Sequence, residues 1–131
     1  MRPGSGIIII KKGTNDVLCL YLNIKDDKLY DLTKGIIDNG ETTYETAIRE
    51  AWEEGGIKDM TFPWGKDYIC IKNITMYMAE SDDWPNIVAN PVTGIIEHDG
   101  WEWHNIDKAV ELMPEYLKPF VMWARNKLIG E

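Results

Sequence analysis

A short segment between two glycine-containing turns, Gly35 to Ile57, constrains this chain more than any other, because it places three carboxylates on one helix. Thr42 followed three residues later by Glu45 forms a capping box, so the helix is predicted to begin near residue 43. Gly55-Gly56 predicts its end, since glycine adopts the left-handed conformation that closes a helix at little steric cost.

The predicted helix has two different faces at about 100° per residue. Its apolar face consists of Tyr44, Ala47, Ile48, Ala51 and Trp52. Its acidic face consists of Glu50, Glu53 and Glu54. Neighbouring like charges destabilise a helix by a few tenths of a kcal/mol per pair, and one nearby arginine cannot neutralise three acids. A hard divalent cation such as Mg²⁺ prefers carboxylate oxygens, which indicates a metal site; the alternative is a solvated acidic surface.

Seven residues of this segment occur at a characteristic spacing: Gly35, Glu41, Arg49, Glu50, Glu53, Glu54 and Gly56. The pattern resembles the signature of the Nudix (MutT-type) hydrolases, which cleave a nucleoside diphosphate linked to another group. Ala51 departs from it, since a bulkier aliphatic residue is usual there. The resemblance implies an α/β/α sandwich with a mixed central β-sheet, formed by residues 1–131 as one Nudix domain. The alternation of strand-like and helical segments favours the same α/β class.

The resemblance also implies a metal site, with Mg²⁺ as the expected ion and Mn²⁺ as the alternative. The expected ligands are a backbone carbonyl at Gly35 or Lys34 together with the carboxylates of Glu50, Glu53 and Glu54. Arg49 is expected to orient the glutamates through bidentate hydrogen bonds. Glu41 is expected not to bind the metal itself but to stabilise the loop and the helix that carry the ligands.

Two carboxylates are candidates for the general base. Glu53 is one, and Glu97, six residues before Trp103, is the other; Glu97 could instead bind metal or be a surface residue. Glu102 is a rival to Glu97. His98 is expected to be an exposed loop residue, although its neutral-range pKa also suits catalysis.

The substrate is less constrained, because selectivity lies outside the signature. The segments YDLTKGIIDNGE and ITMYMAE look most like the small dinucleoside polyphosphate hydrolases of the diadenosine tetraphosphate type. This likeness places Lys34, Tyr30 and Tyr77 near phosphate or base. The long loop 81–93 is the predicted substrate-selecting element.

Several other functions are compatible with the same residues. A MutT-like nucleoside triphosphate pyrophosphohydrolase, an ADP-ribose hydrolase and an RNA 5′-end pyrophosphohydrolase use the same chemistry. A catalytically silent nucleotide-binding regulator is a different class, and it would be expected to lack at least one helix carboxylate. All three are present here.

Charge and composition limit the partners. The 131 residues carry a net charge of −8, which disfavours nonspecific binding to the nucleic-acid phosphate backbone. The expected partner is a small nucleotide, and nucleic acid is expected only as a capped or triphosphorylated RNA end. The N-terminal apolar run is too short for a signal peptide or membrane span, so a cytoplasmic protein is expected. The sequence indicates no oligomeric state.

The remaining elements follow from apolar patterning. Strands are predicted at residues 7–10, buried on both faces, and at residues 17–22, 29–32, 36–37, 67–73 and 74–80. Helices are predicted at residues 105–112 and 119–128. Cys19 and Cys70 are expected to be buried free thiols. Phe62 and Trp64 are expected either to pack or to stack on a base.

Overall fold

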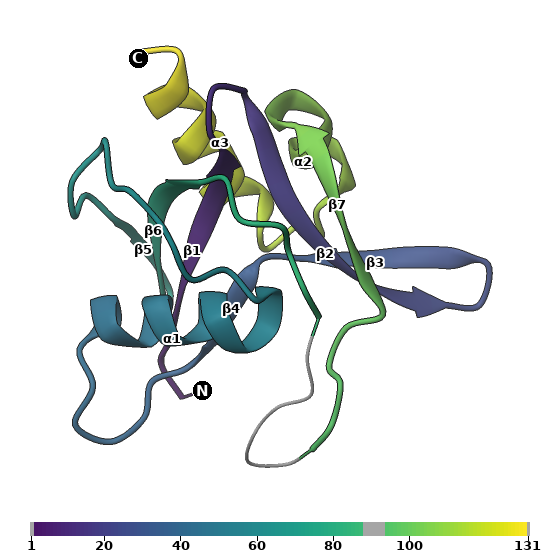
Figure 1. Ribbon diagram of the computed structural model, residues 1–131, viewed down its shortest axis with the longest axis horizontal. Coiled ribbons are helices and arrows are strands. Elements are labelled where there is room, and N and C mark those ends of the chain that lie inside the picture. Colours follow the sequence, from purple (N-terminus) through teal and green to yellow (C-terminus); the bar gives the residue numbers. More distant parts are fainter. Residues whose placement is uncertain (1, 88–93, 131) are drawn as a thin grey trace.

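The computed structural model describes residues 2–87 and 94–130, and within them a mixed β-sheet is covered by helices (Figure 1). The elements in chain order are β1 (Gly4–Lys11), β2 (Asp16–Ile24), β3 (Asp27–Asp31), β4 (Thr33–Ile36), α1 (Thr43–Gly55), β5 (Ile69–Ile71), β6 (Ile74–Ser81), β7 (Gly100–Asn105), α2 (Ile106–Leu112) and α3 (Lys118–Leu128).

The sheet runs in the order β3-β2-β1-β6-β5, with β4 paired to β1 and β7 paired to β2. The pair β1·β6 is parallel and the other described strand pairs are antiparallel. The beginning of β1 pairs with β4, from Gly4 opposite Ile36 to Ile7 opposite Thr33, whereas its end meets β2 at Ile10 opposite Val17. This divergence brings β4 beneath α1.

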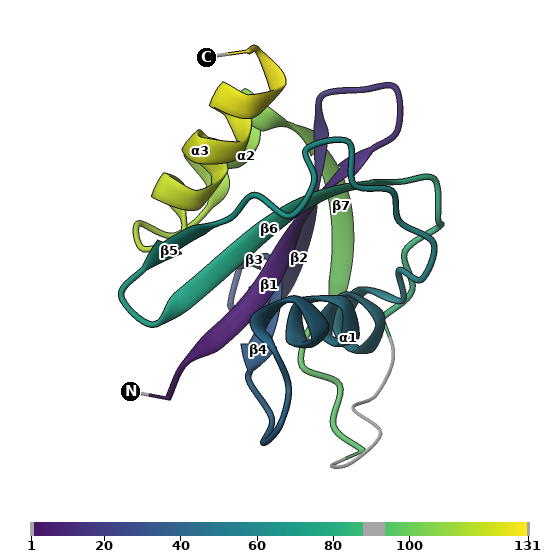
Figure 2. The same ribbon diagram turned by 90° about the vertical axis from the view of Figure 1, so that its left-hand side faces the viewer.

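Strand β1 lies at the centre because its four isoleucines serve two cores. Ile7 and Ile9 pack with Ala47 and Ala51 of α1 on one face. Ile8 and Ile10 face the other core, which includes Phe120 of α3. Successive strand residues point to opposite faces, so an uninterrupted apolar run is what a doubly covered strand requires. The predicted α/β sandwich with a mixed sheet is therefore confirmed (Figure 2).

Helix α1 begins and ends where its local signals predicted. Thr42 is the N-cap and Glu45 completes the capping box, while Gly56 closes the helix with φ of +68°. The predicted packing face was wrong by part of a turn: Ile48 and Trp52 are 36% and 53% exposed. The helix instead turns Thr46 and Glu50 inward, because Glu50 faces the backbone of β4.

Several smaller predictions need correction. Strand β5 has three residues rather than seven, so Cys70 lies on a short edge strand and is exposed, whereas Cys19 is buried as predicted. Strands β2 and β3 extend further into the predicted loop 23–28, and β4 begins at Thr33, so the brief strand predicted at residues 36–37 was misplaced. Phe62 and Trp64 pack against the two cores. Of the predicted substrate-selecting loop, residues 88–93 lie outside the described residues.

Candidate active site

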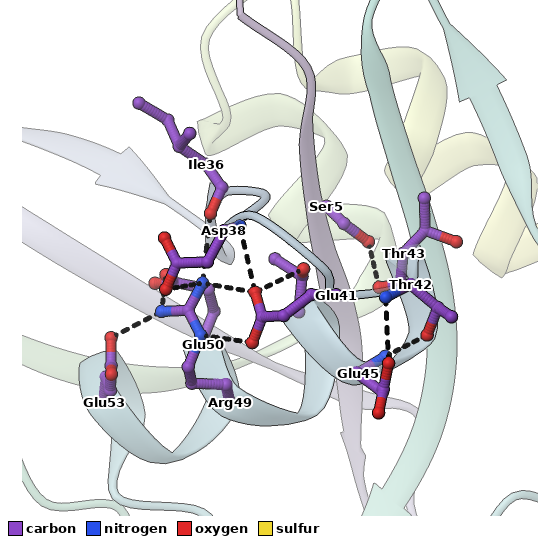
Figure 3. A network of polar contacts seen from close by, with 11 residues as sticks. Ser5, Ile36, Asp38, Glu41, Thr42, Thr43, Glu45, Arg49, Glu50 and Glu53 are labelled. Carbon is purple, nitrogen blue, oxygen red and sulfur yellow. Dashed lines mark hydrogen bonds and ion pairs between the residues drawn. The ribbon is translucent and has the colours of Figure 1, made fainter.

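Arg49 is the centre of a polar network on α1 (Figure 3). Its Nε and Nη2 donate to the two carboxylate oxygens of Glu41 at 2.8 and 3.0 Å. Its Nη1 donates to Glu50 Oε1 at 2.8 Å and to Glu53 Oε2 at 2.9 Å. Nη2 also donates to the carbonyl oxygen of Ile36 at 3.0 Å, which ties the end of β4 to the helix. One guanidinium thus contacts three of the predicted site carboxylates.

Glu41 is held in turn by the loop before α1. Its Oε1 accepts hydrogen bonds from Thr46 Oγ1 at 2.8 Å and from the Asp38 backbone N–H at 3.0 Å. The hydrogen bonds from Arg49 hold the pKa of Glu41 at about 2, and the Glu41 carboxylate helps to raise the pKa of Arg49. Glu41 is therefore ionised at neutral pH, and its contacts fix the guanidinium between loop and helix.

Glu54 belongs to the acidic cluster but, unlike Glu53, does not contact Arg49. Its Oε1 accepts a hydrogen bond from the Lys34 backbone N–H at 2.7 Å, and its carboxyl group shares another with Glu97. Burial, followed by the nearby carboxyl groups of Glu97, Asp31 and Glu50, raises the pKa of Glu54 to about 9, although the Lys34 N–H opposes this. Burial also raises the pKa of Glu50 despite the adjacent Arg49. Negative charge is thus costly here without a cation.

Gly35 lies directly against the Glu50 carboxylate. A Cβ atom at this position would lie 2.2 to 2.5 Å from the carboxyl atoms of Glu50, so only glycine leaves room for that group. This close approach brings the backbone of β4 to the acids of α1. The backbone at Gly35 and Lys34, where a carbonyl ligand was predicted, is therefore adjacent to both Glu50 and Glu54.

The donor set fits a hard divalent cation. Glu50, Glu54 and Glu97 supply only oxygen donors, and burial with neighbouring carboxyl groups disfavours the charged form of Glu54, a penalty that a bound cation would offset. Among residues 2–87 and 94–130, no group of three or more acidic, histidine or cysteine side chains is placed to hold a metal ion by itself. Mg²⁺ commonly uses only one or two carboxylates together with water and substrate phosphates, so a complete cage is not required.

A pocket beside the acids, which we call the hairpin pocket, has a volume of about 180 Å³. It is lined by Leu22, Leu29, Tyr30, Asp31, Glu97, His98, Pro114 and Tyr116. The apolar and aromatic side chains would accommodate a planar ring, and Glu97 connects the pocket to Glu54.

His98 anchors the loop that carries Glu97. Its Nε2 contacts Asp31 Oδ2 at 3.0 Å, and Asp31 Oδ1 contacts Lys34 Nζ at 3.0 Å. Burial opposes ionisation of Asp31, but His98 and Lys34 outweigh it and lower the pKa of this carboxyl group. The expectation of an exposed His98 was wrong, because its side chain is buried in this network.

The other predicted residues are placed differently. Tyr30 lines the hairpin pocket, and its hydroxyl donates to Glu102 Oε1 at 2.8 Å. Glu102, the rival to Glu97, is also paired with Lys28 and does not join the helix acids. Tyr77 is 5% exposed and its hydroxyl contacts Thr43 Oγ1 at 2.6 Å, so it packs beneath α1 and lines neither the acidic cluster nor the hairpin pocket; its contact with substrate stays a prediction.

Asp31 and Tyr116 were not identified from the sequence as site residues. Asp31 had a weak signal, since an acidic residue interrupts the otherwise apolar segment 29–32. Tyr116 lies between α2 and α3, about sixty residues from the signature, and no local pattern distinguishes it. Only the tertiary fold brings Tyr116 next to β3 and Lys34.

Known proteins resemble this chain in both sequence and fold. The family model described as NUDIX domain matches residues 1–124. An RNA pyrophosphohydrolase from Agrobacterium fabrum is 28% identical, over 79% of this chain and 71% of that protein. A C. elegans Ap4A hydrolase crystal structure, a binary complex, has a TM-score of 0.76 and 20% identity, covering 98% of this chain and 99% of that one. The MutT protein from Methanosarcina mazei Go1 has a TM-score of 0.65 and 18% identity, covering 96% of both chains. At these identities the two structures show a shared fold.

Proposed function

The chain belongs to the Nudix hydrolase family, whose members are pyrophosphohydrolases, and from this premise we propose that it cleaves the phosphate bridge of a dinucleoside polyphosphate such as diadenosine tetraphosphate. The observation that carries the choice of substrate is the position of the hairpin pocket. An apolar pocket with two tyrosines adjoins the acidic cluster through Glu97, so a base and the phosphates attached to it have neighbouring places.

Mg²⁺ is the proposed cofactor, with Mn²⁺ as the alternative, held by Glu50, Glu54 and the backbone at Gly35. When bound, such an ion neutralises phosphate charge and activates water. Glu53, predicted as a ligand, is instead paired with Arg49 in the structure. We assign Arg49 to positioning Glu50, since it contacts that carboxylate while Glu41 holds the guanidinium in place.

Glu97 is the proposed general base, and Glu53 is the alternative. Glu97 is exposed, lies in the hairpin pocket and contacts Glu54, whereas Glu53 accepts a hydrogen bond from Arg49 and is paired with it. In the proposed reaction a water oxygen bonds to phosphorus, a bridging P–O bond breaks, and the base takes the water proton. The bridging oxygen leaves on the second nucleotide's phosphate.

A second candidate is removal of pyrophosphate from an RNA 5′ end. The specific observation in its favour is the 28% identity to an RNA pyrophosphohydrolase. The net charge of −8 weighs against this substrate, because an acidic protein repels a long polyanion such as RNA. If RNA is the substrate, only its terminal nucleotide and the attached phosphates would occupy the hairpin pocket. A nucleoside triphosphate or ADP-ribose would place one nucleotide in the same pocket without the rest of the RNA chain.

The test is a substrate panel with Mg²⁺. Purified protein is incubated with diadenosine tetraphosphate, nucleoside triphosphates, ADP-ribose and 5′-triphosphorylated RNA, and products are separated by ion-exchange chromatography. The comparison variants are Glu54→Gln and, as a control, Glu111→Gln, whose side chain is 73% exposed on α2. We expect turnover to fall at least about 100-fold only in Glu54→Gln.

Each other outcome has a definite meaning. Faster cleavage of the RNA would replace the dinucleotide as substrate. Absence of turnover on every compound would favour a nucleotide-binding regulator. Equal turnover in Glu54→Gln and wild type would remove this carboxylate from the site.

A further inference from the structure

A second pocket lies on the other side of Tyr116, and we call it the N-terminal pocket. Its volume is about 210 Å³, and it is formed where the starts of β1 and β6 meet the end of β4. Gly4 of β1 pairs with both Ile36 of β4 and Ile74 of β6, so the three strands form its floor. Figure 2 shows the N-terminal end of β1 beside the turn between β5 and β6.

The walls of this pocket combine apolar surface with positive charge. Ile36 is 46% exposed and Tyr116 is 53% exposed, which leaves apolar surface open to solvent. Arg2 and Lys34 also line the pocket, and the Lys34 ammonium is paired with Asp31 at 3.0 Å. The chain has 14 basic residues against 22 acidic ones, whereas the described residues that line this pocket include two basic and no acidic side chains, which departs from the overall charge. This combination suits a nucleoside that carries phosphate.

The N-terminal pocket is connected to the candidate active site by three shared groups. Gly35 lines it and also contacts the Glu50 carboxylate. Lys34 lines it, and its backbone N–H donates to Glu54. Tyr116 lines both this pocket and the hairpin pocket. A phosphate chain lying over the acids could therefore have one end in each pocket.

We propose that the N-terminal pocket binds the second nucleoside of a two-headed substrate, with Arg2 and Lys34 facing its attached phosphate. This inference rests on the proposed function, and it explains why a substrate with a nucleoside at both ends would be preferred. A nucleotide with a single nucleoside occupies the hairpin pocket alone and leaves the N-terminal pocket empty. The residue that determines this specificity is Ile36, whose side chain forms an exposed apolar wall.

The test compares two substrates that have the same number of phosphates. Diadenosine tetraphosphate carries two nucleosides, and adenosine 5′-tetraphosphate carries one. The variant is Ile36→Glu, which places a polar and negatively charged group in the pocket. Its control is Ile24→Glu on β2, because Ile24 is also 46% exposed and lines neither pocket.

We expect Ile36→Glu to lower kcat/KM for diadenosine tetraphosphate about 10-fold, mainly through KM, and to change kcat/KM for adenosine 5′-tetraphosphate less than about 2-fold. Arg2→Ala should act in the same direction, and Ile24→Glu should leave both substrates unchanged. An equal loss on both substrates would place the damage at the acids and overturn the inference, as would no loss on either.

The wild-type protein separates failure of the inference from failure of the proposed function. If it cleaves neither compound, the proposed dinucleotide substrate and the second subsite both fail. If it cleaves diadenosine tetraphosphate and Ile36→Glu does so equally well, the proposed function stands and only the second subsite is refuted.

Discussion

Replacing Arg49 tests whether one guanidinium stabilises the helix acids. In Arg49→Met, the carboxylates of Glu41, Glu50 and Glu53 lose four hydrogen bonds from a single side chain, and the Ile36 carbonyl loses a fifth. The remaining charges then repel each other at close range.

The magnitude follows from the burial of this network. Removing one partner of a buried ion pair costs about 3 to 5 kcal/mol, whereas an exposed pair contributes less than about 1 kcal/mol. The side chains of Arg49, Glu50 and Glu53 are 24%, 9% and 15% exposed, so the network lies nearer the buried limit. We expect a loss of about 2 to 4 kcal/mol, which corresponds to a fall in Tm of roughly 6 to 15 °C for a domain of this size.

The assay is urea unfolding and thermal melting in metal-free buffer at pH 7. Arg49→Lys should lose a smaller amount, because it keeps the charge but not the two-pronged contact with Glu41. Arg125→Met is the control, since Arg125 pairs with Asp107, whose side chain is 69% exposed. Equal losses in Arg49→Met and Arg125→Met would refute the assignment of a shared, largely buried network.

Three further predictions concern other parts of the site and fold. Gly35→Ala should lower turnover at least about 10-fold by displacing the Glu50 carboxylate from its place against β4; Gly13→Ala, with open space around it, should leave turnover unchanged. Burial alone would raise the pKa of Glu102, but hydrogen bonds from three neighbours hold it at about 2. The ionised Glu102 therefore stabilises the fold above about pH 4.5, and this stabilisation is lost as pH falls toward 2. In urea unfolding at pH 7, Glu102→Gln should lower the free energy of unfolding by about 1 to 2 kcal/mol. The difference from wild type should disappear as pH falls from about 4.5 toward 2. His98→Ala should lower kcat about 10-fold by releasing the neighbouring candidate base, with partial recovery in His98→Asn, measured by steady-state kinetics.

The sequence predicted the features that depend on neighbouring residues. Thr42 and Glu45 determine where α1 begins, and Gly56 determines where it ends, because capping is a local interaction. The four isoleucines of β1 likewise predicted a strand covered on both faces. The inward rotation of Glu50 was not predictable in this way, since it depends on Gly35, fifteen residues earlier, lying across from it.

Contacts between distant segments account for what sequence reasoning missed. His98 was expected to be exposed, but its partner Asp31 is 67 residues away. Tyr116 reaches the site only because α2 and α3 pack against the sheet. No helix in the described part of the chain is long and apolar enough to cross a membrane.

The acidic cluster therefore divides into two parts with different electrostatic roles. Glu41 and Glu53 share the guanidinium of Arg49, so the protein itself neutralises that part. Within the described residues, no lysine, arginine or histidine side chain forms an ion pair with Glu54, and its neighbour Glu97 is a second carboxyl group that shares a hydrogen bond with it. Glu50 lies between the two parts, with one oxygen on Arg49 and its carboxyl group against Gly35. A divalent cation consequently gains most at the Glu54 side, which is also the side that faces the hairpin pocket through Glu97.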